Sequence, residues 1–508
     1  MKMRKLFAGI AAAATLLGGM ALGATSAQAD GAGIIVRGEA NFTFTAQQDA
    51  KQLTNRKLNA YKIADYVQYG TDNSAAYGVQ TASTVTDNSG IKAALEAAVA
   101  GTNKTVPTDG SDLMAWALAE GVLSSDSAGT DGAWSNSASR KFVESLKNAT
   151  DKLGTVKTVD LGAVANGTSA TVTLPAGLYL FVDADYPAGT NKKATPSIAI
   201  LVGSGSVENS VLKDPLTEAT VNIKNQTTAV TKEVNGKDAI TASAGQKVTY
   251  TITSKVPQNM QYYGNYTYTY TDTPSAGQTV DLDSLKVKVG NKTLNENADY
   301  TVNKGEGEKF TVNITSIQNQ TAGAVITVTY EATVTEPEAV GNKAVTNAVV
   351  LSDNGAEATD STIITNSGFS FTKTDAQGNP LAGATFTINV PGMKLFTAIS
   401  GENGKVTFKG LADGTYTVNE TAVPAGFQEN LKATFTVTIK DGETTFAGTD
   451  VWGLAPKNSS ADYKVKNVKN VTQLPLTGAA GTTLFTVVAL LVAGAGVAVA
   501  LKSRQRMH

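Results

Sequence analysis

Short runs of alternating apolar and polar residues, separated by turn residues, restrict the fold of this chain more than any other feature. In the stretch from 226 to 365 they occupy residues 247–252, 266–270, 310–314 and 325–330. Alternation with a period of two is typical of a half-buried strand, and regularly spaced strands of this kind are typical of an immunoglobulin-like sandwich. The sequence therefore predicts a β-sandwich over residues 226–365.

The same pattern continues in a smaller unit. Alternating runs occupy residues 384–388, 405–408, 415–418 and 433–439, and turn residues separate them. We therefore expect a second, smaller sandwich over residues 366–470.

The stretch from residue 30 to 225 has a mixed pattern. Strand-like runs at 41–45, 170–174 and 178–183 flank a region of helical periodicity, which covers residues 91–100, 112–123 and 140–153. We expect an α+β domain with its helices on one side of a β core. The predicted fold class is mainly β and multi-domain, with this domain first and the two sandwiches after it.

The N-terminus has the order of a secretory signal peptide. Basic residues in the first five positions precede an apolar run at 6–22, and Ala27-Gln28-Ala29 follows. This order predicts a signal peptide over residues 1–29 and a mature chain that begins near Asp30. A permanent membrane anchor is the alternative, and the small-residue cleavage site argues against it.

The C-terminus has three consecutive parts. An apolar stretch within residues 479–501 would form a helix of roughly 27 Å over its last 18 residues, which is close to the hydrocarbon thickness of a bilayer. Residues 502–508 are basic and would stay cytoplasmic. The preceding motif consists of Leu474, Pro475, Leu476, Thr477 and Gly478.

These three parts together resemble the cell-wall sorting signal of sortase substrates. The resemblance implies cleavage between Thr477 and Gly478, a transmembrane helix that holds the chain only until cleavage, and final attachment at the cell wall and cell surface.

The composition excludes several kinds of chemistry. The chain has no cysteine, and its one histidine, His508, lies in the tail that sorting would remove. Disulfides, thiolate metal sites, cysteine nucleophiles and a Ser-His-Asp triad are therefore excluded, and we expect no metal and no cofactor. A formal net charge of −2 offers no basic stripe for nucleic acid. An exported chain without disulfides needs another source of robustness.

Several polar residues share the inward face of the predicted strands. Lys232 is in step with Val230 and Val234, and Lys373 with Phe369 and Phe371. Each sandwich in this way receives one inward lysine in its first strand, one acid midway and one asparagine in its last strand, and such groups are costly to bury unpaired. The two sets are Lys232, Asp272 and Asn347, and Lys373, Glu420 and Asn467.

An intramolecular Lys-Asn amide would remove this cost. An apolar site lowers the pKa of a lysine and raises that of a carboxyl group. The neutral amine can then attack the asparagine while the protonated acid, Asp272 or Glu420, hydrogen-bonds the asparagine carbonyl. Loss of ammonia leaves a neutral crosslink, Lys232 to Asn347 and Lys373 to Asn467.

The local sequences resemble those of isopeptide-forming pilin domains. Phe371-Thr-Lys373, Tyr416-Thr-Val-Asn-Glu420 and Val465-Lys-Asn467 are similar to the lysine strand, E-box and final strand of a CnaB-type domain. Thr231-Lys-Glu-Val, Thr271-Asp-Thr-Pro and Thr346-Asn-Ala-Val are similar to a CnaA-type domain. Nearly the whole mature chain therefore resembles a sortase-assembled backbone pilin of Gram-positive bacteria.

Alternatives stay open for each set. The residues could be ordinary strand lysines, a surface acid and asparagines near turns. Glu331 is the rival of Asp272, although its parity with Thr329 rather than Tyr330 argues against it, and Asn470 is the rival of Asn467.

Polymerisation needs a lysine that points away from the core. Val221 and Ile223 share one face, which leaves Lys224 on the other. The segment is similar to the pilin motif of backbone subunits, but Asn222-Ile223 replaces the usual Tyr-Pro. The resemblance implies a bond between Thr477 of one subunit and Lys224 of another, with Lys213 as the rival nucleophile.

The resemblance implies a structural subunit that supports adhesion and is not an enzyme. The implied partners are a pilus-specific sortase, further copies of the chain, ancillary or tip pilins, peptidoglycan through a housekeeping sortase, and a host glycan or matrix protein as ligand. The alternatives are a wall-anchored adhesin or ancillary pilin that does not form the shaft, and a hydrolase that uses carboxylates alone. In the first domain, Lys62 is an unsupported candidate for a third crosslink.

Overall fold

The computed structural model describes most of the chain between residues 33 and 474. The ranges are 33–48, 50–70, 76–123, 137–184, 194–208, 211–223, 225–258, 260, 263, 265–336, 344–448, 450–457 and 462–474. The predicted signal peptide, Lys224, and residues 475–508 with the predicted membrane helix lie outside these ranges. Within them, no helix is long and apolar enough to cross a membrane.

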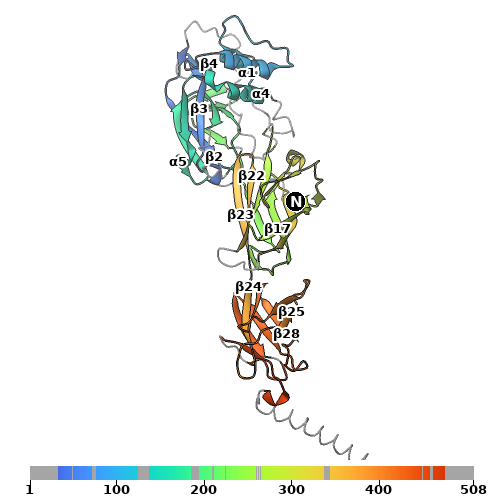
Figure 1. Cartoon of the computed structure of the whole chain (residues 1–508). Helices are drawn as coiled ribbons and strands as arrows, with labels where there is room; N and C mark the ends of the chain where they lie inside the picture. Colours follow the sequence, from blue (N-terminus) through green and yellow to red (C-terminus); the bar gives the residue numbers. More distant parts are fainter. Residues whose placement is uncertain are drawn as a thin grey trace, which may run out of the picture.

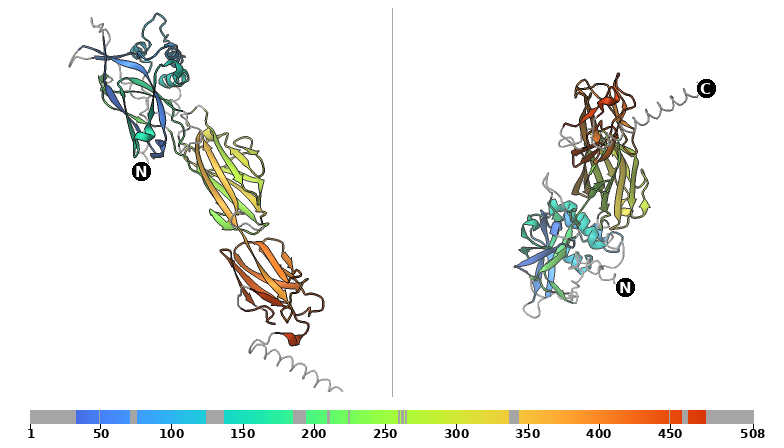
Figure 2. Two further views of the ribbon diagram at one scale, coloured as in Figure 1. Left: turned by 60° about the vertical axis from the view of Figure 1, so that its left-hand side comes forward. Right: turned by 90° about the horizontal axis from the view of Figure 1, so that it is seen from below.

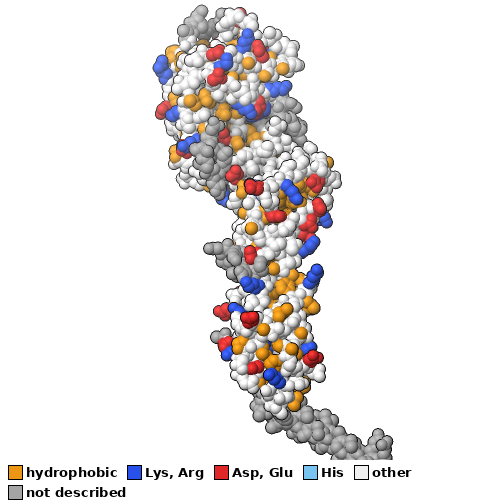
Figure 3. Space-filling view, in the orientation of Figure 1, with side chains coloured by type: hydrophobic (Ala, Val, Ile, Leu, Met, Phe, Trp, Pro, Cys, Tyr) orange, Lys and Arg blue, Asp and Glu red, His pale blue; other side chains and the backbone are white. Residues whose placement is uncertain are grey.

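The chain folds into three bodies that follow one another along an elongated molecule (Figures 1 and 2). Each body has its own hydrophobic core, formed within residues 40–223, 230–364 and 369–474. This mainly β, multi-domain architecture confirms the predicted fold class. On the face shown in Figure 3, basic and acidic side chains are interspersed along all three bodies.

The N-terminal domain has a β core of two main sheets. One has the strand order β1-β3-β8-β9, with β4 and β5 also paired to β3, and the other has the order β12-β2-β7-β6. A third pair is β10-β11. The strands are β1 Ile34–Ile35, β2 Glu39–Thr45, β3 Lys57–Tyr69, β4 Ala76–Thr81, β5 Val156–Asp160, β6 Ala165–Asn166, β7 Ser169–Pro175, β8 Leu178–Asp183, β9 Ile200–Gly203, β10 Ser206–Glu208, β11 Val211–Asp214 and β12 Ala219–Asn222.

Helices of this domain lie together at the far end of the molecule (Figure 1). They are α1 Ser89–Val99, α2 Leu113–Ala119 and α4 Ala138–Leu146, and the one-turn α5 Leu161–Val164 lies apart from them. The predicted helix over 140–153 is shorter than expected. Past Leu146 the chain continues as a 3-10 turn, in which Ala149 has non-helical angles of φ −124° and ψ 30°.

The middle domain is a sandwich of two sheets. Their strand orders are β13-β15-β21-β17-β18 and β14-β23-β22-β16-β20-β19. Alternate burial along β15 and β21 follows the period-two pattern of the sequence and directs tyrosines and valines into one core. The strands are β13 Thr231–Val234, β14 Ala239–Thr241, β15 Lys247–Lys255, β16 Tyr268–Pro274, β17 Gln278–Val289, β18 Lys292–Thr293, β19 Thr301–Lys304, β20 Phe310–Asn313, β21 Val325–Val334, β22 Val345–Asp353 and β23 Ala356–Thr365.

One expectation for this domain is wrong. Asn347 was expected in the last strand, but it lies on β22, and β23 follows it. β23 pairs with β22 in an antiparallel hairpin and with β14 in parallel. The run from 356 to 365 has only scattered apolar residues because its middle faces solvent, so the alternation signal is weak there.

The C-terminal domain is a smaller sandwich. Its sheets have the orders β27-β24-β31 and β26-β25-β28-β29-β30. The first and last strands, β24 and β31, are parallel neighbours, with Lys373 opposite Val465. The strands are β24 Ser367–Thr374, β25 Thr385–Ile388, β26 Phe396–Ile399, β27 Lys405–Leu411, β28 Gly414–Ala422, β29 Thr434–Lys440, β30 Glu443–Gly448 and β31 Lys464–Lys466.

Gln226 connects the first domain to the second. Its backbone C=O accepts from Thr195 N–H at 2.7 Å, and its N–H donates to Thr195 Oγ1 at 3.0 Å. Its side-chain amide donates to Tyr266 OH at 3.2 Å and to Asp353 Oδ2 at 3.1 Å, and accepts from Gln258 N–H at 2.8 Å. One buried residue therefore joins both domains, with its backbone bonded to the first and its side-chain amide to the second.

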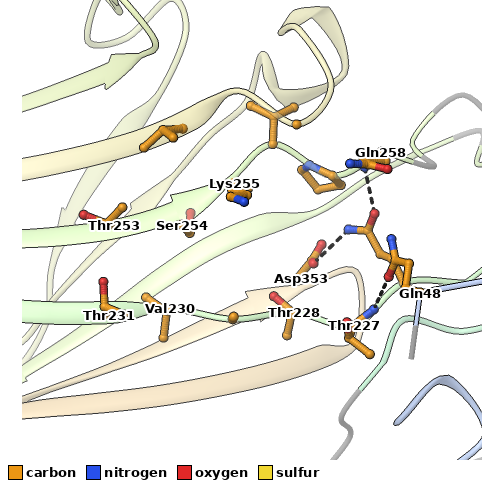
Figure 4. Close-up of a pocket in the computed structure, with 16 residues that line it drawn as sticks. Gln48, Thr227, Thr228, Val230, Thr231, Thr253, Ser254, Lys255, Gln258 and Asp353 are labelled. Atoms are coloured by element: carbon orange, nitrogen blue, oxygen red, sulfur yellow. Dashed lines mark hydrogen bonds between the residues drawn. The ribbon is translucent and has the colours of Figure 1, made fainter. Parts of the chain in front are cut away.

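A groove of about 400 Å³ opens beside this junction (Figure 4). The pairing between β13 and β15 ends at Thr231 and Thr253. The groove lies between the segment that precedes β13 and the segment that ends and follows β15. Thr228, Lys255 and Asp353 contribute to its wall. Among the described residues that line the groove there is no predicted crosslink residue.

The second junction is also hydrogen-bonded. Ala244 N–H donates to Gly410 C=O at 2.9 Å, and Ala412 N–H donates to Ser243 Oγ at 2.9 Å. Asp413 N–H donates to Thr241 Oγ1 at 3.0 Å. The facing ends of the middle and C-terminal domains are thus joined by hydrogen bonds as well as through the chain between β23 and β24.

Candidate functional site

The structure brings the first predicted set together in the core of the middle domain. Lys232 lies on β13, Asp272 on β16 and Asn347 on β22, and each is 0% exposed. Lys232 belongs to the five-stranded sheet, whereas Asp272 and Asn347 lie on neighbouring strands of the six-stranded sheet. A bond from Lys232 to Asn347 would therefore join the two sheets.

Tyr330 on β21 is the fourth member of this cluster. Its hydroxyl accepts from Lys232 Nζ at 2.8 Å and from Asn347 Nδ2 at 2.7 Å, and donates to the Asp272 carboxylate, both of whose oxygens lie at 3.1 Å. Lys232 Nζ also donates directly to Asp272 Oδ2. Sequence reasoning missed this hydroxyl, although Tyr330 shares the inward parity of its strand. Alternation along a strand shows which side chains point into the core, but it does not show which residues of other strands they contact there.

Burial shifts the ionisation of the middle cluster. It lowers the pKa of Lys232, against the opposing effect of the Asp272 charge, and it raises the pKa of Asp272, against the effect of Lys232. Lys232 Nζ lies 5.0 Å from the ring centre of Tyr250 and 5.2 Å from that of Tyr330. This buried, aromatic setting favours the neutral amine and the protonated acid that nucleophilic attack needs.

The second predicted set meets in the core of the C-terminal domain. Lys373 lies on β24, Glu420 on β28, and Asn467 directly after β31. Lys373 Nζ is 3.3 Å from Glu420 Oε1 and 5.7 Å from the ring centre of Phe386. Glu420 Oε2 accepts from Asn467 Nδ2 at 3.1 Å and from the Ala433 backbone N–H at 3.0 Å. The lysine and the asparagine lie on one sheet, and the acid reaches them from the other.

Burial has the same effect on this second set. It lowers the pKa of Lys373 to about 8, while the Glu420 charge opposes the shift. It also raises the pKa of Glu420, against the effects of Lys373 and of the Ala433 N–H. Near neutral pH the free amine, which is the nucleophilic form, is therefore much more populated for Lys373 than for an exposed lysine.

Both clusters leave polar atoms unsatisfied. Among the described residues, Asn347 Oδ1, Lys373 Nζ, Glu420 Oε1 and Asn467 Oδ1 are buried without a hydrogen-bond partner. The acid was expected to contact the asparagine carbonyl, but Glu420 Oε2 instead accepts a hydrogen bond from the amide nitrogen of Asn467. Each unsatisfied buried atom costs about 1–3 kcal/mol, so a reaction that removes the charged groups is favoured.

The rival residues lie elsewhere. Glu331 is only partly buried and pairs with Lys247 at 3.0 Å, and Asn470 is exposed at the end of the C-terminal domain. In the first domain, Lys62 pairs with Asp65 at 2.6 Å, and the described buried residues of that domain include no lysine.

The predicted intersubunit linkage is only partly described. Lys213 lies on β11, and Lys224 lies outside the described residues. Leu474 is the last described residue, so Pro475, Leu476, Thr477 and Gly478 lie beyond the described part. Ile223 and Asn225, the neighbours of Lys224, are both buried.

Three family models match parts of the chain. Residues 226–366 match the Sgo0707 N2 domain, residues 367–451 match the prealbumin-like fold domain of the SpaA type, and residues 466–506 match the LPXTG cell wall anchor motif. No curated protein matches the sequence.

Solved structures of pilins are similar to this chain. The T6 backbone pilin of serotype M6 Streptococcus pyogenes has a modular three-domain structure; it aligns with a TM-score of 0.53 and 18% identity, over 83% of this chain and 82% of that one. The full-length major pilin SpaD from Corynebacterium diphtheriae aligns with a TM-score of 0.48 and 16% identity, over 85% of this chain and 98% of that one.

The first likeness shows the fold, and the anchor motif shows the mode of surface attachment. The SpaA-type domain lies directly before that motif, as the order of the matched residues shows. The chain therefore has the cell wall anchor motif of a surface protein and a fold similar to that of a backbone pilin.

Proposed function

We propose that this chain is the backbone subunit of a covalent pilus, in which a pilus-specific sortase joins Thr477 of one subunit to Lys224 of the next. Each subunit is reinforced by two internal amides, Lys232 to Asn347 and Lys373 to Asn467. Ancillary or tip pilins and peptidoglycan, through a housekeeping sortase, are the further partners. The observation that carries the proposal is the pair of buried Lys-acid-Asn clusters in consecutive domains.

These clusters are costly unless they react. Burial of ionised groups carries a penalty of several kcal/mol per ion, and a packed apolar core could have filled either site. Lys373 and Glu420 are both fully enclosed, as are Lys232 and Asp272. A neutral amide removes the charges and leaves a covalent link between strands.

The chemical step balances without a cofactor. The free amine of the lysine attacks Cγ of the asparagine, and the bond from Cγ to Nδ2 breaks. One proton passes from Nζ to Nδ2 by way of the acid, and ammonia leaves. The acid ends as it began, so Asp272 and Glu420 promote the reaction without being consumed.

Intact mass tests this proposal on the mature chain, Asp30 to Thr477. Each amide removes about 17 Da as ammonia, so we expect a deficit of about 34 Da. Lys232→Ala and Lys373→Ala should each reduce the deficit by one ammonia, beyond the change in residue mass.

The rival residues provide matched controls. Glu331→Gln and Asn470→Ala should keep the full deficit because neither side chain belongs to a buried cluster. Asp272→Asn and Asn467→Ala should each reduce the deficit by one ammonia, because one crosslink no longer forms. A wild-type chain without any deficit would remove the chemical basis of the proposal and leave a wall-anchored adhesin as the better function.

The two crosslinks are expected to respond differently to tension. In the middle domain β23 lies outside the loop that Lys232 and Asn347 close, so residues 348–365 can be drawn out. These 18 residues would release at most about 60 Å. In the C-terminal domain only a short non-strand tail follows Asn467 in the described part, so no comparable step is expected.

Single-molecule pulling of one subunit checks this expectation. The middle domain of the wild type should yield in one short step, and Lys232→Ala should convert it to a step of several hundred Å as the whole domain extends. A long middle-domain step in a wild-type subunit that shows the full mass deficit would contradict the assignment of the crosslink to Asn347.

A further inference from the structure

The hydroxyl of Tyr330 contacts all three predicted reactants of the middle domain. It lies 2.8 Å from the attacking nitrogen of Lys232, 2.7 Å from the leaving nitrogen of Asn347, and 3.1 Å from both oxygens of Asp272. Tyr330 is 1% exposed, and its ring packs on Tyr250 and Phe310 at centroid distances of 5.2 and 5.1 Å. Its position is therefore set by the core and not by solvent.

The C-terminal cluster achieves the same connections without a hydroxyl. There the Glu420 carboxyl itself lies between the two reactants, 3.3 Å from Lys373 Nζ and 3.1 Å from Asn467 Nδ2. The side chain above Lys373 Nζ is Phe386, which offers no proton. Aspartate is one methylene shorter than glutamate. In the middle domain the leaving nitrogen, Asn347 Nδ2, is hydrogen-bonded to the Tyr330 hydroxyl, which lies between this nitrogen and Asp272.

We propose that Tyr330 is a catalytic residue of amide formation in the middle domain, where it transfers the proton that releases Asn347 Nδ2 as ammonia. The proposal rests on the proposed function, because it concerns the same Lys232-Asn347 bond. It also assigns different proton paths to the two domains, one through tyrosine and aspartate and one through glutamate alone.

The proton path follows contacts that already exist. Lys232 Nζ, once bonded to Asn347 Cγ, gives one proton to Asp272, with which it is hydrogen-bonded, and this proton replaces the one that the protonated acid gives up to Tyr330. Asp272 passes a proton to the Tyr330 oxygen while the Tyr330 hydroxyl turns and gives its own to Nδ2. The bond from Cγ to Nδ2 breaks, ammonia leaves, and Asp272 and Tyr330 regain their initial states.

Burial keeps Tyr330 in the form that this path requires. Desolvation, with a further contribution from the Asp272 charge, raises the pKa of the phenol well above its ordinary value. The hydroxyl thus stays protonated and serves as a neutral carrier in the apolar core.

A Tyr330→Phe chain tests the proposal, with the C-terminal crosslink as an internal control. After pulsed synthesis, the mature chain is followed by intact mass, and peptide mapping assigns each lost ammonia to its domain. We expect the C-terminal amide to form at the wild-type rate and the middle amide to form about a hundredfold more slowly, as is usual for loss of a general acid-base group. Equal rates for the middle amide in both chains would overturn the proposal.

Two further variants separate chemistry from folding. Tyr270→Phe removes a buried hydroxyl from β16 that bonds Ser254 at 2.6 Å, so it should keep the wild-type rate. A fluorinated tyrosine at position 330 keeps the shape but makes the hydroxyl more acidic, and the rate of the middle amide should change with that acidity. An unchanged rate there would count against Tyr330 even if Tyr330→Phe folded poorly.

Failure of the proposed function looks different. A wild-type chain that loses no ammonia in either domain would refute the crosslinks themselves. The other outcome is a wild-type chain that loses two ammonia molecules and a Tyr330→Phe chain that forms the middle-domain amide at the same rate. That outcome would support the crosslinks and refute only the role of Tyr330.

Discussion

A Glu420→Ala chain is expected to lose at least about 5 kcal/mol from the free energy of unfolding of its C-terminal domain. Removing one member of a buried charged pair costs about 3–5 kcal/mol because the partner, here Lys373, stays buried and unpaired. Without the acid the amide does not form, and the loss of a link closing about 95 residues forgoes roughly 4 to 5 kcal/mol. Both costs arise from the same substitution and are not independent, so we do not expect the free energy of unfolding to fall by their full sum.

Calorimetry of the mature chain measures this loss. For a domain of this size, 5 kcal/mol corresponds to a fall in melting temperature on the order of 20 °C or more. Glu402→Ala is the matched control, since Glu402 is exposed in a turn of the same domain and should change stability by less than about 0.5 kcal/mol. A Glu420→Ala domain that melts with the wild type would contradict the assignment.

Glu420→Gln separates the two contributions. The amide keeps the shape of the side chain and can still pair with the Ala433 N–H, but it cannot carry the proton. We expect this variant to lack the crosslink and yet to retain more stability than Glu420→Ala.

Loss of all polymer is the expected result of Lys224→Ala in cells that express the pilus sortase. Transfer of the Thr477 acyl group needs one accessible amine, and an alanine leaves nothing to accept it. The readout is the ladder of covalent polymers on a denaturing gel, together with the linked peptide that joins Thr477 to Lys224. Monomers should still reach the wall, because the sorting motif is unchanged.

Lys213→Ala is the control for this position. It should leave the ladder intact, since Lys213 was only the rival nucleophile. A ladder lost in Lys213→Ala and kept in Lys224→Ala would move the linkage to β11, and a ladder kept in both would require another lysine.

Parity along strands allowed the sequence to predict much of the candidate site. Each strand has one inward face, so Lys232 with Val230 and Val234, or Lys373 with Phe369 and Phe371, had to point at a core, and both lysines are 0% exposed. Local patterns also gave the sandwiches and the approximate helices of the first domain.

Contacts between distant strands could not be predicted in this way. Tyr330 meets Asp272 across the core because of how the two sheets pack, and no spacing within β21 encodes that. The strand β23 was missed because Asp360, Ser361 and their neighbours weaken its alternation. The Gln226 junction depends on three segments that are far apart in the sequence, and only the folded chain brings them together.

The parallel pairing of β24 with β31 sets an order in time. An exported chain emerges from its N-terminus, so Lys373 appears 94 residues before Asn467, and the proposed amide could form only when nearly the whole domain is outside the membrane. Asn467 in turn lies only seven residues before Leu474, where the sorting motif begins. Closure of the proposed bond would therefore mark a domain that has finished folding, immediately ahead of the motif at which the sortase is proposed to cut.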